Sequence, residues 1–165
     1  MNGRHAGTHR GGATAFAFEI TDYVRFGTDN SLLVVVSNSQ RNDVLPTSTD
    51  MNLYGGIYRE AELILTERTA ISPLYLGSDG VLVHPQTVGP EKVEGEIEVH
   101  ITSKGDNSCT LNVDITSPRG ERVFSKRQKA RLDGKPVSVA FSVDNPTLWS
   151  LRDPALYTCL LYTSD

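Results

Sequence analysis

The sequence predicts an all-β protein, and three observations support this fold class. Apolar and polar residues alternate along most of the chain, which is the pattern of strands with one face in a core and one in water. Short clusters rich in Gly, Asp, Asn and Pro separate the alternating runs, as turns between antiparallel strands do. No long segment has the apolar spacing of an amphipathic helix, and a single helical turn is expected at residues 21–24.

Each alternating run predicts one strand. The first, residues 14–20, places Phe16, Phe18 and Ile20 on one face, and the second, residues 32–36, is apolar on both faces. Four further strands are expected, of which the last three alternate most cleanly, at residues 57–65, 96–101, 109–116 and 137–143. Short strands separated by regular turns are typical of a β-sandwich or barrel.

Composition narrows the class of protein and of partner. The 165 residues are 38% hydrophobic and 22% charged, which favours a globular fold over disorder, and the net charge of −4 gives no basic excess for a nucleic-acid backbone. The longest aliphatic run, residues 32–36, is far shorter than the roughly 20 residues of a membrane span, so no membrane association is expected. No signal peptide is visible, and the compartment stays unknown.

Few side chains outside one loop suggest chemistry. Cys109 and Cys159 form no CxxC pair, and Cys109 is expected to be a small buried residue. His100 falls on the polar face of its predicted strand and is expected to be solvated. The basic run at residues 126–129 is expected on a strand edge, where its charges prevent edge-to-edge pairing.

The segment at residues 39–56 does not fit the strand pattern. It is long for a loop inside a compact domain, and long ordered loops are often functional. Asp50 lies within it, just before an aromatic and Gly-rich stretch. A loop Asp commonly caps a turn, and spacing alone leaves that reading open beside a ligand-binding one.

Several spaced motifs resemble those of family 2 glycoside hydrolases, especially β-galactosidase-like members. Residues 50–60, DMNLYGGIYRE, resemble the family signature D-x-x-x-Y-G-G-I-Y-R-[DE]. In the same order as in the family, further segments resemble its N-G-x-x-x-G-x-H-x-G-G, F-D-I-T-D-Y, N-x-L-x-V-x-V and N-P-x-L-W-S…P-x-L-Y motifs, at residues 2–16, 18–23, 30–36 and 145–157. The resemblance covers nearly the whole chain.

The resemblance implies a layout of two β domains. Residues 1–67 would be the C-terminal half of a truncated jelly-roll sugar-binding domain, and residues 68–165 an immunoglobulin-like β-sandwich. The family's catalytic (β/α)₈ barrel, of about 250 residues, would follow and carry both catalytic glutamates. The resemblance therefore implies no catalytic residue in this chain, and the chain's partners would be its own missing barrel and a carbohydrate.

Asp50 is the one site residue that the resemblance implies here. The matching Asp of β-galactosidase-like members reaches the barrel pocket and holds the terminal sugar through a hydroxyl, and in some members through a cation. The resemblance thus implies substrate binding by Asp50, and in the parent enzyme a possible metal role with Na⁺ or Mg²⁺. Arg59 is expected to form an ion pair beneath the loop, and Tyr54 and Tyr58 to pack it.

Both ends of the chain are expected to be truncated. The dipeptide Asn2-Gly3 is a hairpin signal that implies a preceding strand. At the other end, residues 159–165 read CLLYTSD, which departs from the family and matches one reading frame of a common sequencing adapter. These seven residues are therefore expected to be an artefact.

The expected function is that of the non-catalytic N-terminal part of a retaining glycosidase, with β-galactosidase as the favoured activity. Two alternatives stay open, a stand-alone carbohydrate-binding module and a structural interaction domain, because sandwich folds host many functions. A binding module would expose an aromatic platform, yet the single Trp, Trp149, lies in a motif that looks structural.

Overall fold

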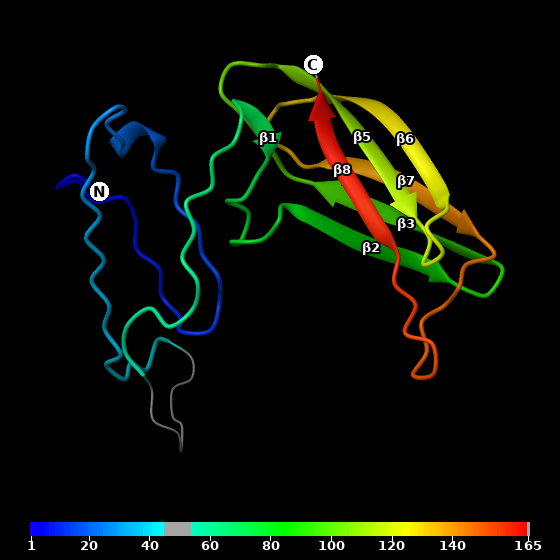
Figure 1. The fold of residues 1–165 in the computed structure, drawn as a ribbon, viewed down its shortest axis with the longest axis horizontal. Helices are drawn as coiled ribbons and strands as arrows, with labels where there is room; N and C mark the ends of the chain where they lie inside the picture. The colour runs from blue at the N-terminus through cyan, green and yellow to red at the C-terminus, as the bar shows by residue number, and fades with distance from the viewer. Residues whose placement is uncertain (45–53, 165) are drawn as a thin grey trace.

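The computed structural model describes residues 1–44 and 54–164, and almost all of the regular secondary structure in these residues is β strand (Figure 1). A short 3₁₀ helix, η1, covers Thr21–Tyr23, within the predicted helical turn. The eight strands all follow residue 68, in the order β1 Thr69–Ile71, β2 Val81–Val88, β3 Lys92–Val99, β4 Ile101–Ser103, β5 Ser108–Thr116, β6 Arg122–Arg131, β7 Val137–Asp144 and β8 Thr158–Ser164.

The strands form a two-layer sandwich. One sheet has the order β2-β3-β7 and the other β6-β5-β8, and all pairings are antiparallel. Figure 1 shows the two sheets stacked as layers, with the short β1-β4 pair at the end nearer the N-terminal part of the chain. This arrangement confirms the all-β fold class and the sandwich in the second half of the chain.

The core lies between the two sheets, where alternating side chains meet. Ile97 and Val99 of β3 and Val139 of β7 face Leu111 and Val113 of β5, and each of these five side chains is at most 1% exposed. Buried residues recur at every second position over most of β3, β5 and β7, so the three cleanest alternating runs in the sequence are confirmed as strands, the first of them as far as Val99.

Residues 1–44 and 54–66 are extended, but they form no strand ladder. The strands predicted at residues 14–20, 32–36 and 57–65 are therefore not confirmed. A ladder needs a second backbone about 4.8 Å away to take its hydrogen bonds, and the described residues supply none here beyond the Asn2–Ser31 contact. Leu33 and Val35 are 80% and 86% exposed, so the described residues do not cover their side chains either.

The predicted turn at Asn2-Gly3 is present. Asn2 and Gly3 both have positive φ, 50° and 76°, and the Arg4 amide donates to the Met1 carbonyl at 2.9 Å. Positive φ at both central residues defines the type I′ turn that joins hairpin strands.

The sandwich meets the N-terminal part at a second turn of the same kind. Leu76 and Gly77 have φ of 53° and 62°, and Ser78 closes the turn on the Tyr75 carbonyl at 2.9 Å. The Gly77 backbone lies directly against that of residues 15–16. β1 begins at Thr69, next to the predicted domain boundary, which itself stays a prediction.

Three side-chain predictions meet the structure in the sandwich. Cys109 is buried in the core as expected, and burial raises the pKa of its thiol. Lys126 and Lys129 lie on β6, an edge strand, as expected. The solvated reading of His100 is wrong, because its side chain is only 17% exposed. The strand breaks between β3 and β4 at this residue, and the ring stacks on Tyr75 at 3.5 Å between centroids.

β8 pairs with β5 from Thr158 to Ser164, so the segment expected to be an artefact occupies a sheet edge. Its origin stays a prediction.

Candidate functional site

Asp50, the predicted sugar and cation ligand, lies outside the described residues 1–44 and 54–164. The site is therefore defined by the two described flanks of its loop, residues 37–44 and 54–58, which we call the stem. A third piece of chain lies against the stem, and we call residues 7–12 the glycine-rich segment.

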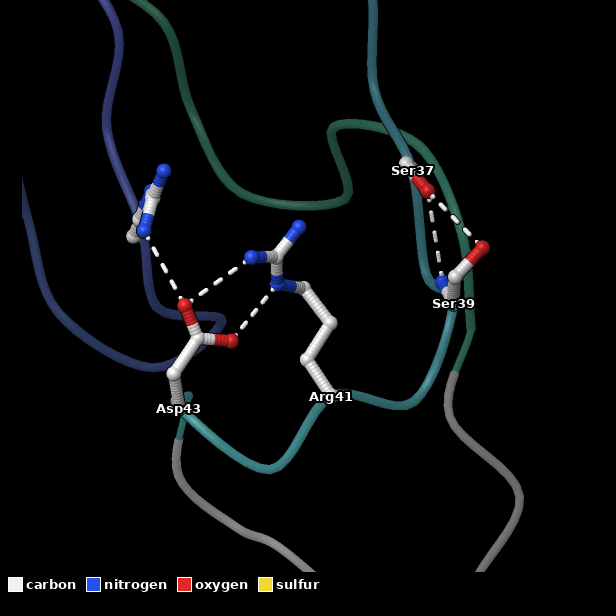
Figure 2. Close-up of polar contacts among 5 residues, drawn as sticks. Ser37, Ser39, Arg41 and Asp43 are labelled. Carbon is white, nitrogen blue, oxygen red and sulfur yellow. Dashed lines mark hydrogen bonds and ion pairs between the residues drawn. The ribbon is translucent and has the colours of Figure 1, made fainter.

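The first flank of the stem is held by a carboxylate between two guanidinium groups. Arg41 binds Asp43 through two bonds, Nε to Oδ1 at 2.8 Å and Nη2 to Oδ2 at 2.9 Å (Figure 2). Arg10, from the glycine-rich segment, donates Nη1 to the same Oδ2 at 3.0 Å. The hydrogen bond from Arg41, together with the charges of both arginines, lowers the pKa of Asp43 from 3.8 to about 2.

A hydroxyl pair stiffens the chain just before this cluster. The Ser37 hydroxyl donates to Ser39 Oγ at 3.1 Å, and the Ser39 amide also reaches Ser37 Oγ at 3.4 Å (Figure 2). Such short-range side-chain bonds hold a turn where no ladder is available.

The second flank of the stem bonds to the same glycine-rich segment. The Tyr58 hydroxyl donates to the Gly12 carbonyl at 3.1 Å. Arg59 places its guanidinium over the Tyr58 ring, 5.9 Å from the centroid, rather than in the expected ion pair among the described residues. Gly55 lies beside the Asn38 side chain, so the two flanks run next to one another.

The glycine-rich segment is itself packed by aromatic rings. The Phe18 ring lies so close to Gly7 that a Cβ there would sit 2.3 Å from it, which explains the glycine. His9 stacks on Phe16 at 4.4 Å between centroids and shares a 3.2 Å hydrogen bond with Thr14. The segment thus serves as a platform that receives both flanks of the stem.

Asp43 is committed to two arginines, and no group of three or more His, Cys, Asp or Glu side chains in the described ranges could hold a metal ion. The one helix among the described residues is η1, and it is too short to cross a membrane.

The last of the family-like motifs, residues 145–157, is held by a hydrogen bond between its two ends. The Thr147 amide donates to the Tyr157 hydroxyl at 2.8 Å, which closes the segment on itself. Trp149 is half exposed, and it lines an apolar cavity of about 360 Å³ at the end of the sandwich together with Phe141 and Leu156.

Sequence reasoning missed the Arg10–Asp43 contact altogether. The two residues lie 33 positions apart, and neither belongs to an alternating run or to the loop motif at residues 50–60. The only sequence signal for a contact at this position was the run of glycines around Arg10, because glycines often occur where another backbone approaches closely.

Comparison with known proteins shows which sequences and structures the chain resembles. Residues 81–165 match the sequence model of glycosyl hydrolases family 2. The chain is 36% identical to a β-glucuronidase of Bacteroides fragilis over 95% of its own length and 28% identical to a β-galactosidase of Thermoanaerobacter pseudethanolicus over 95%. It covers only 23% and 21% of those two proteins.

Solved structures agree. A Bacteroides fragilis protein assigned as a β-galactosidase superposes with a TM-score of 0.88 and 28% identity, over 99% of this chain and 25% of that one. A Bacteroides uniformis β-glucuronidase, solved covalently bound to a cyclophellitol-6-carboxylate aziridine, superposes with a TM-score of 0.81 and 30% identity over 98% of this chain and 20% of that one. The motifs, the sandwich and these relatives agree, and the chain belongs to glycosyl hydrolase family 2.

Proposed function

We propose that the chain is the non-catalytic β part of a retaining exo-β-glycosidase. In the whole enzyme a carboxylic acid would protonate the glycosidic oxygen and a second carboxylate would attack the anomeric carbon. The observation that carries the proposal is that the chain aligns, over nearly its whole length, with about a fifth of β-glucuronidases and β-galactosidases.

The substrate that we propose is a terminal β-glucuronide, with a β-galactoside as the second candidate. The galactoside was the expectation from the sequence motifs, and the higher identity to the Bacteroides fragilis β-glucuronidase, 36% against 28%, favours the glucuronide instead. The full-length gene product, assayed on p-nitrophenyl β-D-glucuronide and β-D-galactoside, should give the higher kcat/KM on the glucuronide. A higher value on the galactoside would reverse the assignment.

Within that enzyme, Asp50 is proposed to hold the terminal sugar, either directly or through a cation such as Na⁺ or Mg²⁺. A carboxylate suits both roles, as a charge-assisted acceptor and as a hard oxygen ligand. The proposal is supported by the stem, whose two flanks are both bonded to the glycine-rich segment. Asp50→Ala in the full-length protein should raise KM by roughly tenfold or more. Unchanged KM and kcat would remove this role.

A titration of the chain with sugar distinguishes the proposed function from the alternative, a stand-alone carbohydrate-binding module. The chain by itself, titrated with galactose or glucuronate, should show no saturable binding if the sugar site is completed by the rest of the enzyme. Saturation below about 1 mM, which corresponds to a binding free energy of about −4 kcal/mol or stronger, would favour the module.

A further inference from the structure

The charges of the chain are distributed unevenly along the sequence. Residues 119–131 hold six of the 16 Lys and Arg residues but only one of the 20 Asp and Glu residues, Glu121. Six positive charges and one negative charge give this stretch a net charge of +5, whereas the whole chain carries −4. The six cations are Arg119, Arg122, Lys126, Arg127, Lys129 and Arg131.

β6 collects three of these cations in a line on the outside of the sandwich. Ala130 is buried and Phe124 packs against the core, so the alternate positions point outward. Those positions include Arg127, Lys129 and Arg131, which are all exposed and which we call the basic row. Neighbours in the row are about 7 Å apart along the strand. Figure 1 shows β6 on the side of its sheet away from the N-terminal part of the chain.

The basic row is scarcely neutralised by the protein itself. Among the described residues, neither Arg127 nor Lys129 forms an ion pair. Arg131 meets Asp133 only at 4.0 Å, and its side chain is 86% exposed. Protection of an edge strand from pairing accounts for charge on β6, but it does not require nearly all of that charge to be of one sign. The row is therefore available to an anionic partner.

The strand beside the basic row indicates which anionic partner fits. Asn112 lies opposite Arg127 and Thr110 opposite Lys129 on β5, so amide and hydroxyl groups flank the cations. β5 and β6 are described in full, and neither has an aromatic side chain on its outward face. Sites for single-stranded nucleic acid normally supply aromatic rings for base stacking. Cations beside hydroxyl and amide groups instead suit the carboxylates and hydroxyls of acidic sugars.

We propose that the outward face of β6 and β5 binds an acidic polysaccharide, a linear chain of carboxylate-bearing sugars, and so holds the whole enzyme on the polymer whose terminal sugar it removes. This proposal rests on the proposed function, in which the terminal sugar is a glucuronide. A single uronate would meet one or two exposed cations, and each such pair contributes little. A polymer engages the whole row at once, and its contacts reinforce one another.

The test is a titration of the full-length gene product with polygalacturonate, whose α-linked chain a β-glycosidase leaves intact. Binding should saturate at low salt and weaken as the salt concentration rises. Arg127→Gln together with Lys129→Gln should weaken it by about two- to thirtyfold, because two exposed ion pairs are lost. The exchange Arg127→Lys with Lys129→Arg keeps both charges and should bind like the unmodified protein. Both variants should keep the kcat/KM of the unmodified protein on p-nitrophenyl β-D-glucuronide or β-D-galactoside, which also reports that they fold.

Arg25→Gln together with Arg152→Gln is the matched control. It also removes two exposed arginine charges, but both residues lie outside β6. Its affinity for polygalacturonate should be unchanged. Neutral dextran, the control for the polymer, should not bind to the unmodified protein.

The binding face and the proposed function fail separately. The face is overturned if the unmodified protein does not bind polygalacturonate, if dextran binds equally well, or if the control variant loses as much affinity. Tighter binding of a thymidine oligonucleotide than of polygalacturonate would also overturn it and would assign the face to nucleic acid. Absence of hydrolysis of both p-nitrophenyl substrates would overturn the proposed function, while the titration would still decide the binding face.

Discussion

The acidity of Asp43 gives a direct test of its local contacts. Its folded pKa, about 2, is lower than its ordinary value of 3.8, so its contribution to stability is present above pH 3.8 and is lost as the pH falls through about 2. Carboxyl NMR of the chain should give a midpoint near the lower value, and Arg41→Gln should move it back toward about 4. The same midpoint in both proteins would contradict the Arg41 bonds.

Three residues differ in how far the sequence predicts their surroundings. Cys109 could be assigned to the core because its neighbours alternate strictly, and the pattern alone decides burial there. His100 could not, because the same alternation continues through the break between β3 and β4, where the ring stacks on Tyr75. The Arg10–Asp43 contact could not be predicted either, because the fold brings together two residues that lie 33 positions apart.

The core makes its own prediction at this scale. Leu111 is fully buried, so Leu111→Ala should lower the free energy of unfolding by about 2–5 kcal/mol through lost burial and a cavity. Leu151 is 90% exposed, and Leu151→Ala should change it by less than about 0.5 kcal/mol. Urea unfolding of both variants measures the difference, and equal effects would place Leu111 outside the core.

At the scale of elements, alternation predicts strands well only where the chain itself supplies their partners. The runs in β3, β5 and β7 each have neighbouring strands, and each is confirmed. The run at residues 14–20 alternates in the same way but forms no ladder among the described residues, because alternation indicates which face of a strand is apolar and not which strand pairs with it. β2 contains Pro85 and is mostly exposed, so its sequence shows no alternating pattern and did not predict a strand.

The turn at Leu76-Gly77 packs against the N-terminal part of the chain, and the contact leaves no room for a side chain at Gly77. A Cβ there would lie 2.7 Å from the Phe16 backbone nitrogen, at a φ of 62°. Gly120 has a φ of 83° with nothing within 4 Å, so Gly120→Ala isolates the backbone strain, about 1–2 kcal/mol. Gly77→Ala should lower the free energy of unfolding clearly more than Gly120→Ala does, as measured by thermal unfolding. Equal costs would mean that the two parts do not pack at this turn.

At the scale of the whole molecule, the ordered set of motifs predicted the family, and the strand runs predicted the sandwich. The sugar could not be predicted, because the motifs are shared by enzymes named for different glycosides. The site could be predicted only in part: the loop at residues 39–56 stood out, but the ties that hold its stem come from residues 10 and 12, far away in sequence.

The proposed function is a division of labour, in which this chain would help to place the sugar and the rest of the enzyme would cleave it. The most direct measurement is the hydrolysis of p-nitrophenyl β-D-glucuronide and β-D-galactoside by the purified chain and by the full-length gene product. We expect turnover of at least one substrate by the full-length protein and none by the chain. Turnover by the chain, or none by the full-length protein, would contradict the account.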